Sequence, residues 1–415
     1  MRIAILTQYF PPEIGAPQAR LSELVRELVE AGHETFVLTA MPSYPIGRVY
    51  DGYSGLVSRE VKDGAAVLRT WAYPNQSPAM ARRLLNYCSF ALMSLLVGLF
   101  RLPRVDYLIC ESPPVFLGAT AWLLSRLKGA RWVFNVSDLW TDTAVRVGVL
   151  TGGWKLRLAA RLEKWCYQQA WCVSGQSREI TSIIETRHPG VSTYHLSNGV
   201  NTKMFTPALR CERFRRDVGF HPYCVVLYSG LHGLAQGLMQ VLHAARLLQN
   251  EEGLKFVLIG DGPEKRQLVE EARRMKLSNI EFRDPISREK MPLLVAAADI
   301  GIVPLKTHIP GAVPSKLYEM MGCGVPVVLA ASGEPAGIVT EASCGLTVPC
   351  DDPPAMADAI RLLLRDVGTR TRMGQAGRYA AERHYNRHII SKRFIEFLER
   401  HMNGAAHSGS TYEKS

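Results

Sequence analysis

The chain has 415 residues, of which 47% are hydrophobic and 21% are charged, and its formal net charge is +11. This composition is typical of a globular protein of two or three domains, and it excludes collagenous, coiled-coil and wholly disordered chains. The positive charge is compatible with solvated basic side chains, an anionic membrane surface or phosphorylated substrates. Nucleic acid is the weakest candidate partner, because the chain has no dense basic block and no recognition motif.

Short apolar, β-branched runs alternate with longer helical patterns. In the first half of the chain, we expect strands at RIAILTQ, TFVLTA, AVLRTWA, DYLIC, WVFNV and WCVSG. A loop-like stretch, SNGVNTKMFTPALRC, follows, and strands resume at YCVVLYSG, LKFVLIG, NIEFRD, DIGIVPL and VPVVLA. The alternation predicts an α/β protein with parallel sheets covered by helices, and the restart predicts two such domains.

The domain boundaries follow from this pattern. We place an N-terminal domain at 1–200 and a C-terminal domain at 213–385. A helix at 386–402 could cross back to the N-terminal domain, and the polar tail at 403–415 is expected to be disordered. The nine cysteines include no CxxC pair, and no motif in the chain indicates a metal site.

One apolar stretch raises the question of a membrane. Residues 84–100 would span roughly 26 Å as a helix, which is at the lower edge of what crosses a bilayer. Arg82, Arg83 and Arg101 flank the stretch. A buried core helix and a membrane-surface segment are both open at this point, and a spanning helix is less favoured.

Glycine-rich turns follow several of the predicted strands. Gly15 lies where the loop after the first strand enters a helix, and Gly230, Gly233 and Gly237 occupy the turn LYSGLHGLAQGLMQ. Such turns can bring backbone amides close to a phosphate, or they can be structural turns only. Neither G-x-G-x-x-G nor a Walker motif is present, so a dinucleotide fingerprint and a P-loop are excluded.

The order of these motifs resembles the retaining glycosyltransferases of family 4. The markers are PPEIGAP, SNGVNTKMF, YSGLHGLAQGL, LIGDGPEK, AAADIGIVPL, VPSKLYEMMGCGVPVV and GEPAGIVTEASCGLTVP, which cover nearly the whole chain. GLHGLAQGL and NVSDLWTDTAV look most like the bacterial O-antigen, capsule and colanic-acid branch, which includes fucosamine transferases. The resemblance implies the GT-B fold, in which two Rossmann-like domains face a central cleft.

The resemblance also implies a donor site in VPSKLYEMMGCG. Glu319 matches the second glutamate of the E-x7-E motif, which accepts hydrogen bonds from the ribose hydroxyls, and Lys316 matches a position facing the diphosphate. Leu317 lies between them. The first glutamate of the motif would fall at Gly311, so the contact to the transferred sugar departs from the family pattern. Backbone amides of residues 311–313 could substitute for it.

The glycine-rich loop departs from the family pattern as well. The usual arginine and lysine are missing, which leaves His232 and Gln236 as candidates for contacts to the pyrophosphate or the sugar. The loop RDPIS matches the segment whose backbone reads the base, around Pro285 and Ile286.

Asp138 is the candidate on the acceptor side. NVSDLW aligns with a family segment that often carries a histidine beside the acceptor, and Asp138 is the one ionisable side chain in this hexapeptide. It could orient or deprotonate the acceptor hydroxyl. A structural cap on the helix that follows is the alternative.

The expected function is transfer of a sugar, with retained anomeric configuration, from a UDP-linked donor to a lipid-linked saccharide acceptor. Asp138, His232, Lys316 and Glu319 are the candidate catalytic residues. An amino or 6-deoxy sugar, no metal or other cofactor, and a cytoplasmic enzyme bound peripherally at the inner face of the cytoplasmic membrane complete the expectation. A nucleotide-sugar 2-epimerase and a non-catalytic nucleotide-sugar-binding protein are the alternatives.

Overall fold

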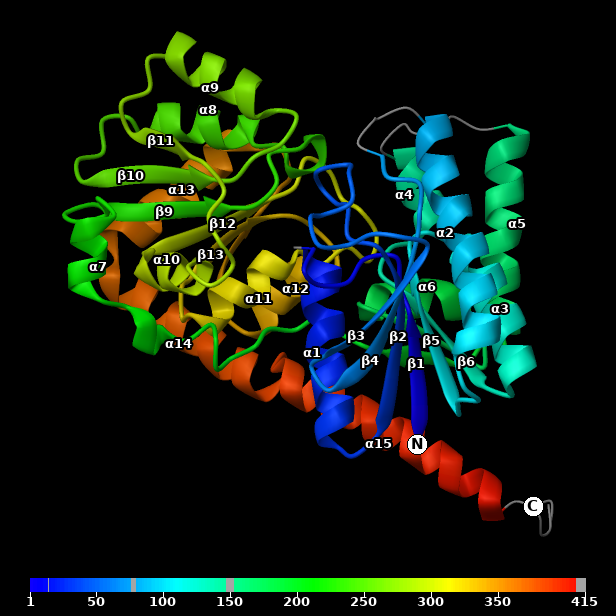
Figure 1. The fold of residues 1–415 in the computed structure, drawn as a ribbon. Helices are drawn as coiled ribbons and strands as arrows, with labels where there is room; N and C mark the ends of the chain where they lie inside the picture. Colours follow the sequence, from blue (N-terminus) through cyan, green and yellow to red (C-terminus); the bar gives the residue numbers. More distant parts are fainter. Residues whose placement is uncertain (14, 76–79, 147–152, 408–415) are drawn as a thin grey trace. The chain divides into compact units, whose positions relative to one another are not determined.

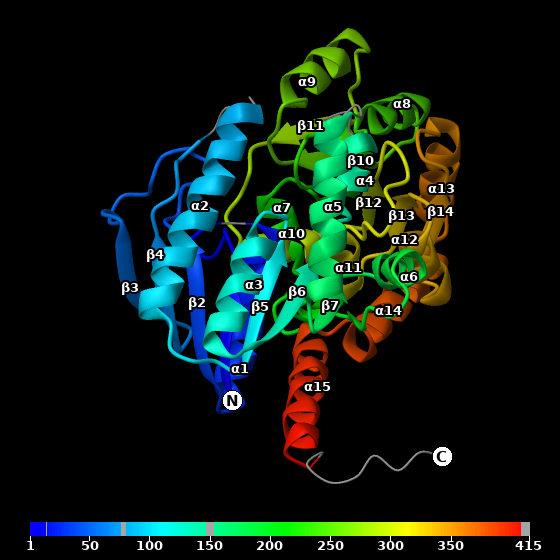
Figure 2. The same cartoon turned by 90° about the vertical axis from the view of Figure 1, so that its right-hand side faces the viewer.

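The computed structural model describes residues 1–13, 15–75, 80–146 and 153–407. It divides the chain into two compact units, unit 1 (residues 1–197 and the chain from His388 onward) and unit 2 (Asn198–Arg387). Each unit is built on its own mainly parallel sheet with helices on both faces (Figures 1 and 2). The predicted α/β class with two doubly wound domains is therefore confirmed.

Unit 1 contains an eight-stranded sheet in the order β3-β4-β2-β1-β5-β6-β7-β8. Its strands are β1 (Arg2–Leu6), β2 (Glu34–Ala40), β3 (Val57–Lys62), β4 (Ala65–Thr70), β5 (Tyr107–Ser112), β6 (Arg131–Val136), β7 (Cys172–Gly175) and β8 (Thr193–His195). Its helices are α1 (Ala16–Glu30), α2 (Met80–Arg101), α3 (Leu117–Lys128), α4 (Trp140–Arg146), α5 (Trp154–Gln169), α6 (Arg178–Arg187) and α15 (Arg387–His407).

Two apolar clusters cover the two faces of this sheet. Side chains from α2, α3, α5 and α6 pack on one face, and side chains from α1 and α15 pack on the other. The central strands are buried on both faces, which explains why they read as continuous apolar runs in the sequence. β3 is different, because it pairs antiparallel with β4 and alternates between exposed and half-buried residues. Its polar sequence, VSREVK, gave no strand prediction.

Unit 2 contains a six-stranded parallel sheet in the order β11-β10-β9-β12-β13-β14. Its strands are β9 (Cys224–Ser229), β10 (Leu254–Ile259), β11 (Ile280–Arg283), β12 (Ile300–Pro304), β13 (Val327–Ala330) and β14 (Gly345–Val348). Its helices are η1 (Pro207–Leu209), α7 (Glu212–Asp217), η2 (Leu234–Gln236), α8 (Met239–Leu247), α9 (Lys265–Arg274), α10 (Met291–Ala297), α11 (Ser315–Gly322), α12 (Glu334–Glu341), α13 (Pro353–Arg365) and α14 (Val367–Arg383).

The chain leaves unit 1 after Ser197 and returns to it at His388. From there α15 packs on the sheet of unit 1, where Tyr107 Oη donates a hydrogen bond to the Leu398 carbonyl at 2.8 Å. The helix runs on to His407, into the segment that the sequence predicts to be disordered from residue 403. The rest of that tail, 408–415, lies outside the described residues.

Candidate functional site

The glycine-rich loop after β9 is held to the end of the neighbouring strand β10. Gly230 N–H donates to the Ile259 carbonyl at 2.9 Å, and His232 N–H donates to the Asp261 carbonyl at 2.9 Å. Within the loop, Tyr228 Oη donates to the Leu231 carbonyl at 2.6 Å. These bonds fix the loop at the carboxyl edge of the sheet, which is where ligands of doubly wound sheets bind.

Two glycines in the turn after β10 allow this close approach. A Cβ on Gly260 would lie 1.8 Å from the Gly230 carbonyl oxygen, and a Cβ on Gly262 would lie 2.4 Å from the His232 carbonyl oxygen. No side chain fits at either distance, so both positions require glycine. The sequence motif LIGDGPEK indicated a turn here, but it did not reveal that the turn supports the glycine-rich loop after the neighbouring strand β9.

His232 is fully buried within this loop. Its ring lies 5.8 Å from the Tyr228 ring and 6.2 Å from the Phe282 ring, measured between centroids. Burial lowers the pKa of His232 to about 4, with a further contribution from Lys265, so the imidazole is neutral near pH 7. Among the described residues, neither ring nitrogen has a hydrogen-bond partner.

Gln236 and Gly237 lie at the far end of the same loop. Gln236 Oε1 is buried and has no hydrogen-bond partner among the described residues. Gly237 has a φ of 56°, and a Cβ there would lie 2.9 Å from Lys306 Cα, so the loop passes tightly against the end of β12. The Lys306 N–H fixes this approach by donating to the Ala235 carbonyl at 2.9 Å.

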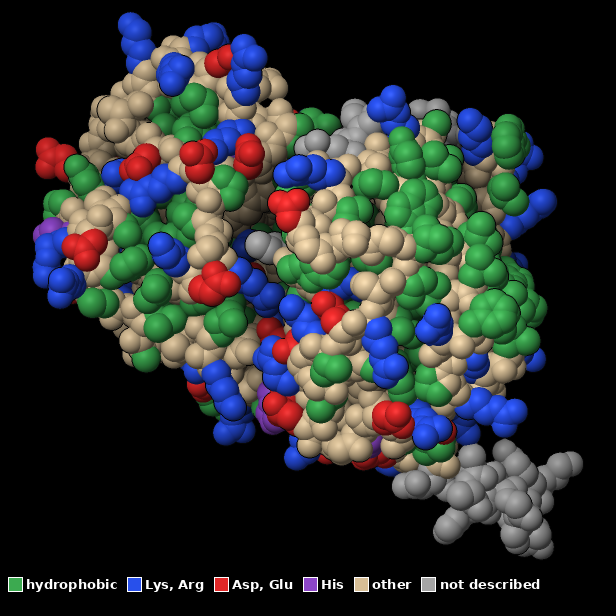
Figure 3. Space-filling model, in the orientation of Figure 1, with side chains coloured by type: hydrophobic (Ala, Val, Ile, Leu, Met, Phe, Trp, Pro, Cys, Tyr) green, Lys and Arg blue, Asp and Glu red, His purple; other side chains and the backbone are tan. Residues whose placement is uncertain are grey.

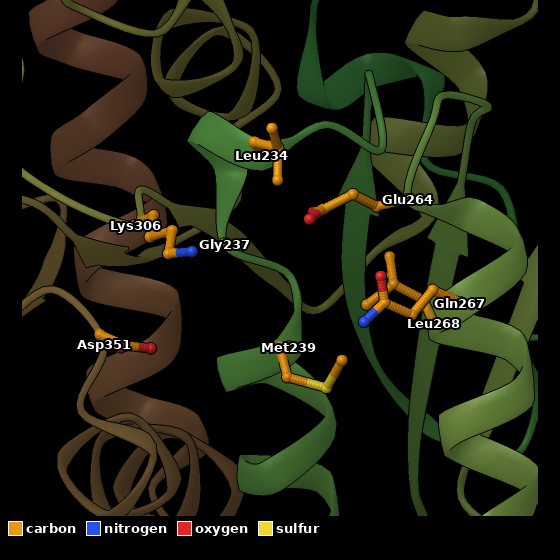
Figure 4. Close-up of a pocket in the computed structure, with 8 residues that line it drawn as sticks. All are labelled: Leu234, Gly237, Met239, Glu264, Gln267, Leu268, Lys306 and Asp351. Atoms are coloured by element: carbon orange, nitrogen blue, oxygen red, sulfur yellow. The ribbon is translucent and has the colours of Figure 1, made fainter. Parts of the chain in front are cut away.

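A small cavity of unit 2 borders Gly237 (Figure 4). Its volume is about 50 Å³, enough for one or two water molecules and far below the 300 Å³ or more of a typical ligand pocket. It is therefore too small to be the site of a nucleotide sugar. The lining residues are Leu234, Gly237, Met239, Glu264, Gln267, Leu268, Lys306 and Asp351.

Lys316 and Glu319 lie in the first turns of α11. Lys316 Nζ is 2.9 Å from Glu319 Oε2, and the two side chains are 29% and 17% exposed. A Cβ on Gly230 would lie 3.8 Å from Lys316 Cε, which places the lysine beside the glycine-rich loop. The structure therefore brings together Gly230, Lys316 and Glu319, three of the residues predicted to bind the donor.

The other predicted donor residues differ in what they offer a ligand. The side chain of Leu317 is fully buried in the core and its N–H donates to the Pro314 carbonyl at 3.1 Å, so it presents no free group. Pro285 is exposed and Ile286 is half-buried in the loop after β11. Gly311, where the family glutamate is missing, has a φ of 76°, a conformation that strains any residue with a Cβ.

One proposed substitute for the missing glutamate is already engaged. The Ala312 N–H, one of the amides of residues 311–313, donates to the Ile309 carbonyl at 3.1 Å. This amide is therefore not available to a sugar in the structure described.

Asp138 follows β6 in unit 1 and is half-buried. The pKa of its carboxyl is raised to about 6, mainly by burial and also by the nearby Glu111, while Arg20 acts in the opposite direction. The helix-cap alternative fails, because Glu163 of α5 accepts the Trp140 N–H at 3.0 Å and the Thr141 hydroxyl. Asp138 itself forms no hydrogen bond with the described residues.

A buried polar network that the sequence did not reveal lies beside Asp138. Arg20 of α1 donates to Glu111 of β5 at 2.5 Å and to Ser137 Oγ at 3.0 Å. Asn135 Nδ2 donates to the other Glu111 oxygen at 2.5 Å, and Asn135 Oδ1 accepts from Ser174 Oγ at 2.7 Å. The network joins the carboxyl ends of β5, β6 and β7, so Glu111 is fixed as an ion pair while Asp138 remains available.

Gly15 precedes α1 in unit 1 with an extended φ of 174°. It therefore belongs to a different unit from the Gly230 loop and Lys316. Within the described ranges, no group of three or more His, Cys, Asp or Glu side chains could hold a metal ion.

The comparisons with known proteins agree on the family. Residues 15–192 match the glycosyl transferase 4-like domain, and residues 212–380 match the glycosyl transferases group 1. The chain is 28% identical over 406 residues to a colanic acid biosynthesis glycosyl transferase, WcaI, of Escherichia coli K12, covering 95% of this chain and 99% of that protein.

Solved structures show the same fold. Sucrose-phosphate synthase from Thermosynechococcus elongatus superposes with a TM-score of 0.78 at 19% identity, covering 97% of this chain and 99% of that one. HepE from Anabaena, in complex with UDP-glucose, superposes with a TM-score of 0.72 at 16% identity, covering 96% and 100%. With both of its units matched in this way, the chain belongs to the group 1 glycosyltransferases of the GT-B fold.

Proposed function

We propose that this protein transfers a sugar from a UDP-linked donor to a lipid-linked saccharide acceptor, with retention of the anomeric configuration. The observation that carries the proposal is the Lys316–Glu319 pair at the start of α11, beside Gly230 and its loop. At the carboxyl edge of a doubly wound sheet, a cation can bind the negative diphosphate of a nucleoside diphosphate, and a carboxylate can accept hydrogen bonds from its ribose hydroxyls.

The two side chains can serve the donor without separating from each other. The Glu319 carboxylate has about four acceptor positions, of which Lys316 occupies one, so ribose hydroxyls can use the others. The Lys316 ammonium has three N–H donors, so it can hold Glu319 and still donate to a phosphate oxygen. When the sugar leaves UDP, the same ammonium stabilises the charge that develops on the diphosphate.

The glycine-rich loop contributes mainly through its backbone. His232 is buried and neutral, so it cannot add a positive charge beside a diphosphate near pH 7. We assign it to shaping the loop between Tyr228 and Phe282, with its unpartnered nitrogens reachable only after the loop moves. Gln236 Oε1 is the second polar group of the loop that could accept a sugar hydroxyl.

Asp138 is our candidate for the residue that accepts the acceptor hydroxyl proton. Its carboxyl has no hydrogen-bond partner among the described residues, and its raised pKa of about 6 makes it a stronger base than an ordinary aspartate. Glu111 is less suited to this role, because Arg20 and Asn135 already occupy its two oxygens.

Two relatives support the choice of substrates. WcaI is named for colanic acid biosynthesis, which favours a surface-polysaccharide acceptor carried on a lipid at the cytoplasmic face of the inner membrane. HepE binds UDP-glucose, which favours a UDP-linked donor. An amino or 6-deoxy sugar remains our proposal for the transferred group on the strength of the fucosamine-transferase resemblance.

The test is to incubate the protein with a panel of UDP- and GDP-linked sugars and a lipid extract, and to follow the products by mass spectrometry. Release of UDP together with a glycosylated lipid supports the proposal. Conversion of the donor into its 2-epimer would identify an epimerase instead. Tight UDP binding without any turnover would identify a binding protein.

A further inference from the structure

Helix α2 is half buried in unit 1. Phe90 and Ser94 are fully buried and Val97 nearly so, all on the face toward the sheet. Helix α3 holds the same side, because Thr120 Oγ1 donates to the Ala91 carbonyl at 3.0 Å and Lys128 Nζ donates to the Leu99 carbonyl at 2.8 Å. This face could not contact lipid unless α2 left the domain.

The opposite face of α2 is apolar and exposed. Leu85, Leu92, Leu96 and Phe100 follow one another at spacings of seven, four and four residues, which places them in one stripe along the helix. They are 52%, 58%, 43% and 78% exposed. By length and composition alone α2 could cross a membrane. Only 28% of its apolar stretch is buried, so it is not an ordinary core helix.

Neighbouring helices extend this apolar surface. Helices α2, α3 and α5 lie side by side in both views of the fold, and hydrophobic side chains gather over them in Figure 3. Leu127 of α3 and Trp154 and Leu158 of α5 are each more than half exposed. We call α2, α3 and α5 together the three-helix surface.

The charge of the three-helix surface has one sign. Helix α2 carries three lysines or arginines, α3 two and α5 four, whereas Glu163 is their one acidic residue. Glu163 is buried and accepts hydrogen bonds from the start of α4. The basic residues are Arg82, Arg83, Arg101, Arg126, Lys128, Lys155, Arg157, Arg161 and Lys164.

We propose that the three-helix surface docks on an anionic lipid bilayer, with α2 lying flat in the interface and its Leu85–Leu92–Leu96–Phe100 stripe inserted. An apolar stripe bordered by basic residues fits the boundary between acyl chains and anionic headgroups. A membrane span is excluded by the buried face of α2, and a second protein copy would face nine like charges. The proposal does not depend on the chemistry proposed above.

The attachment of α2 indicates which end of the docked helix faces the acceptor. Gln8, which follows β1, donates from Nε2 to Asn86 Oδ1 at 2.6 Å, and Asn86 Nδ2 donates to the Tyr73 carbonyl at 2.6 Å. These bonds tie the start of α2 to the carboxyl edge of the sheet. If the proposed function holds, a lipid-linked saccharide reaches the protein at this end of α2.

The test is co-sedimentation of the full chain with vesicles of phosphatidylcholine alone or of phosphatidylcholine with phosphatidylglycerol. We expect binding to the anionic vesicles that weakens with added salt. Removing one basic residue weakens surface attraction about fivefold, so Arg82→Gln with Arg83→Gln should lose about 25-fold. Leu92→Gln with Leu96→Gln should lose about tenfold or more for each leucine inserted.

Matched variants in unit 2 serve as controls. Leu247→Gln with Leu362→Gln replaces two leucines that are equally exposed, and Arg213→Gln with Arg216→Gln replaces two exposed arginines. Both control pairs should bind vesicles as the wild type does, and thermal unfolding should show all variants folded.

Three results would overturn the proposal. The first is a wild type that stays in the supernatant with anionic vesicles at low salt. The second is unchanged binding by the α2 variants. The third is a wild type whose dimer is broken by Leu92→Gln with Leu96→Gln, which would make the surface an interface between copies. None of these results depends on sugar transfer, so the proposal of membrane docking and the proposed function can be refuted independently of each other.

Discussion

Replacing Glu319 with alanine should weaken the binding of uridine as well as that of UDP. The carboxylate is 17% exposed, and Lys316 is its one hydrogen-bond partner among the described residues, which leaves acceptor positions for a ribose. A hydrogen bond to a charged group contributes about 1.5–3 kcal/mol, so the loss of one should raise Kd about 10- to 150-fold.

The effect on UDP should be somewhat smaller than the effect on uridine. Glu319→Ala releases Lys316 from its partner at 2.9 Å, and the ammonium can then attract the diphosphate more strongly. Partly exposed ion pairs contribute about 1 kcal/mol or less, so the gain in diphosphate affinity from the released Lys316 should not exceed about fivefold. Lys316→Met should show the reverse pattern, because it removes a diphosphate contact and leaves the ribose contact in place.

Isothermal titration calorimetry with uridine and with UDP separates the two contributions. Glu319→Gln keeps one oxygen acceptor and should give an intermediate loss, and Glu341→Ala, an exposed carboxylate of α12, should have no effect. An unchanged uridine affinity in Glu319→Ala would refute the ribose contact and leave Glu319 with the role of positioning Lys316.

Four further predictions concern the loop, the acceptor side and metal ions. Gly260→Ala should reduce UDP affinity more than Gly337→Ala, because the new Cβ at 260 would lie 1.8 Å from the Gly230 carbonyl oxygen whereas one at 337 would meet nothing within 4 Å; equal affinities would contradict this. If Asp138 is the base, kcat/KM should rise with pH through about 6 as its carboxyl ionises, and this rise should vanish in Asp138→Asn. Because folding raises the pKa of Asp138, the wild type should lose stability as pH rises from about 4 to about 6, and Asp138→Asn should not; thermal unfolding measures this. If Lys316 takes the place of a metal beside the diphosphate, as proposed, EDTA should leave sugar transfer unchanged; loss restored by manganese or magnesium would refute this.

The fold was largely readable from the sequence because the central strands are parallel and buried on both faces. Such strands are continuous apolar runs, as in β1, β9 and β13, and each is followed by a helical pattern. The edge strand β3 could not be read in this way. Its valines, Val57 and Val61, are exposed and its alternate polar residues are half-buried, so the strand is stabilised by antiparallel pairing with β4 rather than by burial of an apolar face.

The candidate site was readable only where its residues are close together in the sequence. Lys316 and Glu319 are three residues apart on one helix, so a motif can reveal them. The support of the Gly230 loop by Gly260 is a backbone contact between two strands, and no local pattern records it. Arg20 and Glu111 are 91 residues apart and meet only because β1 and β5 are neighbours in the sheet.

The central claim is sugar transfer with retention from a UDP-linked donor, and the stereochemistry of donor turnover tests it most directly. Even without the natural acceptor, slow transfer to water can be followed by proton NMR as each UDP-sugar is turned over. The account predicts that UDP is released and that the first sugar formed has the same anomeric configuration as the donor. A first product of inverted configuration, or a donor epimerised at C2 with no UDP released, would contradict it.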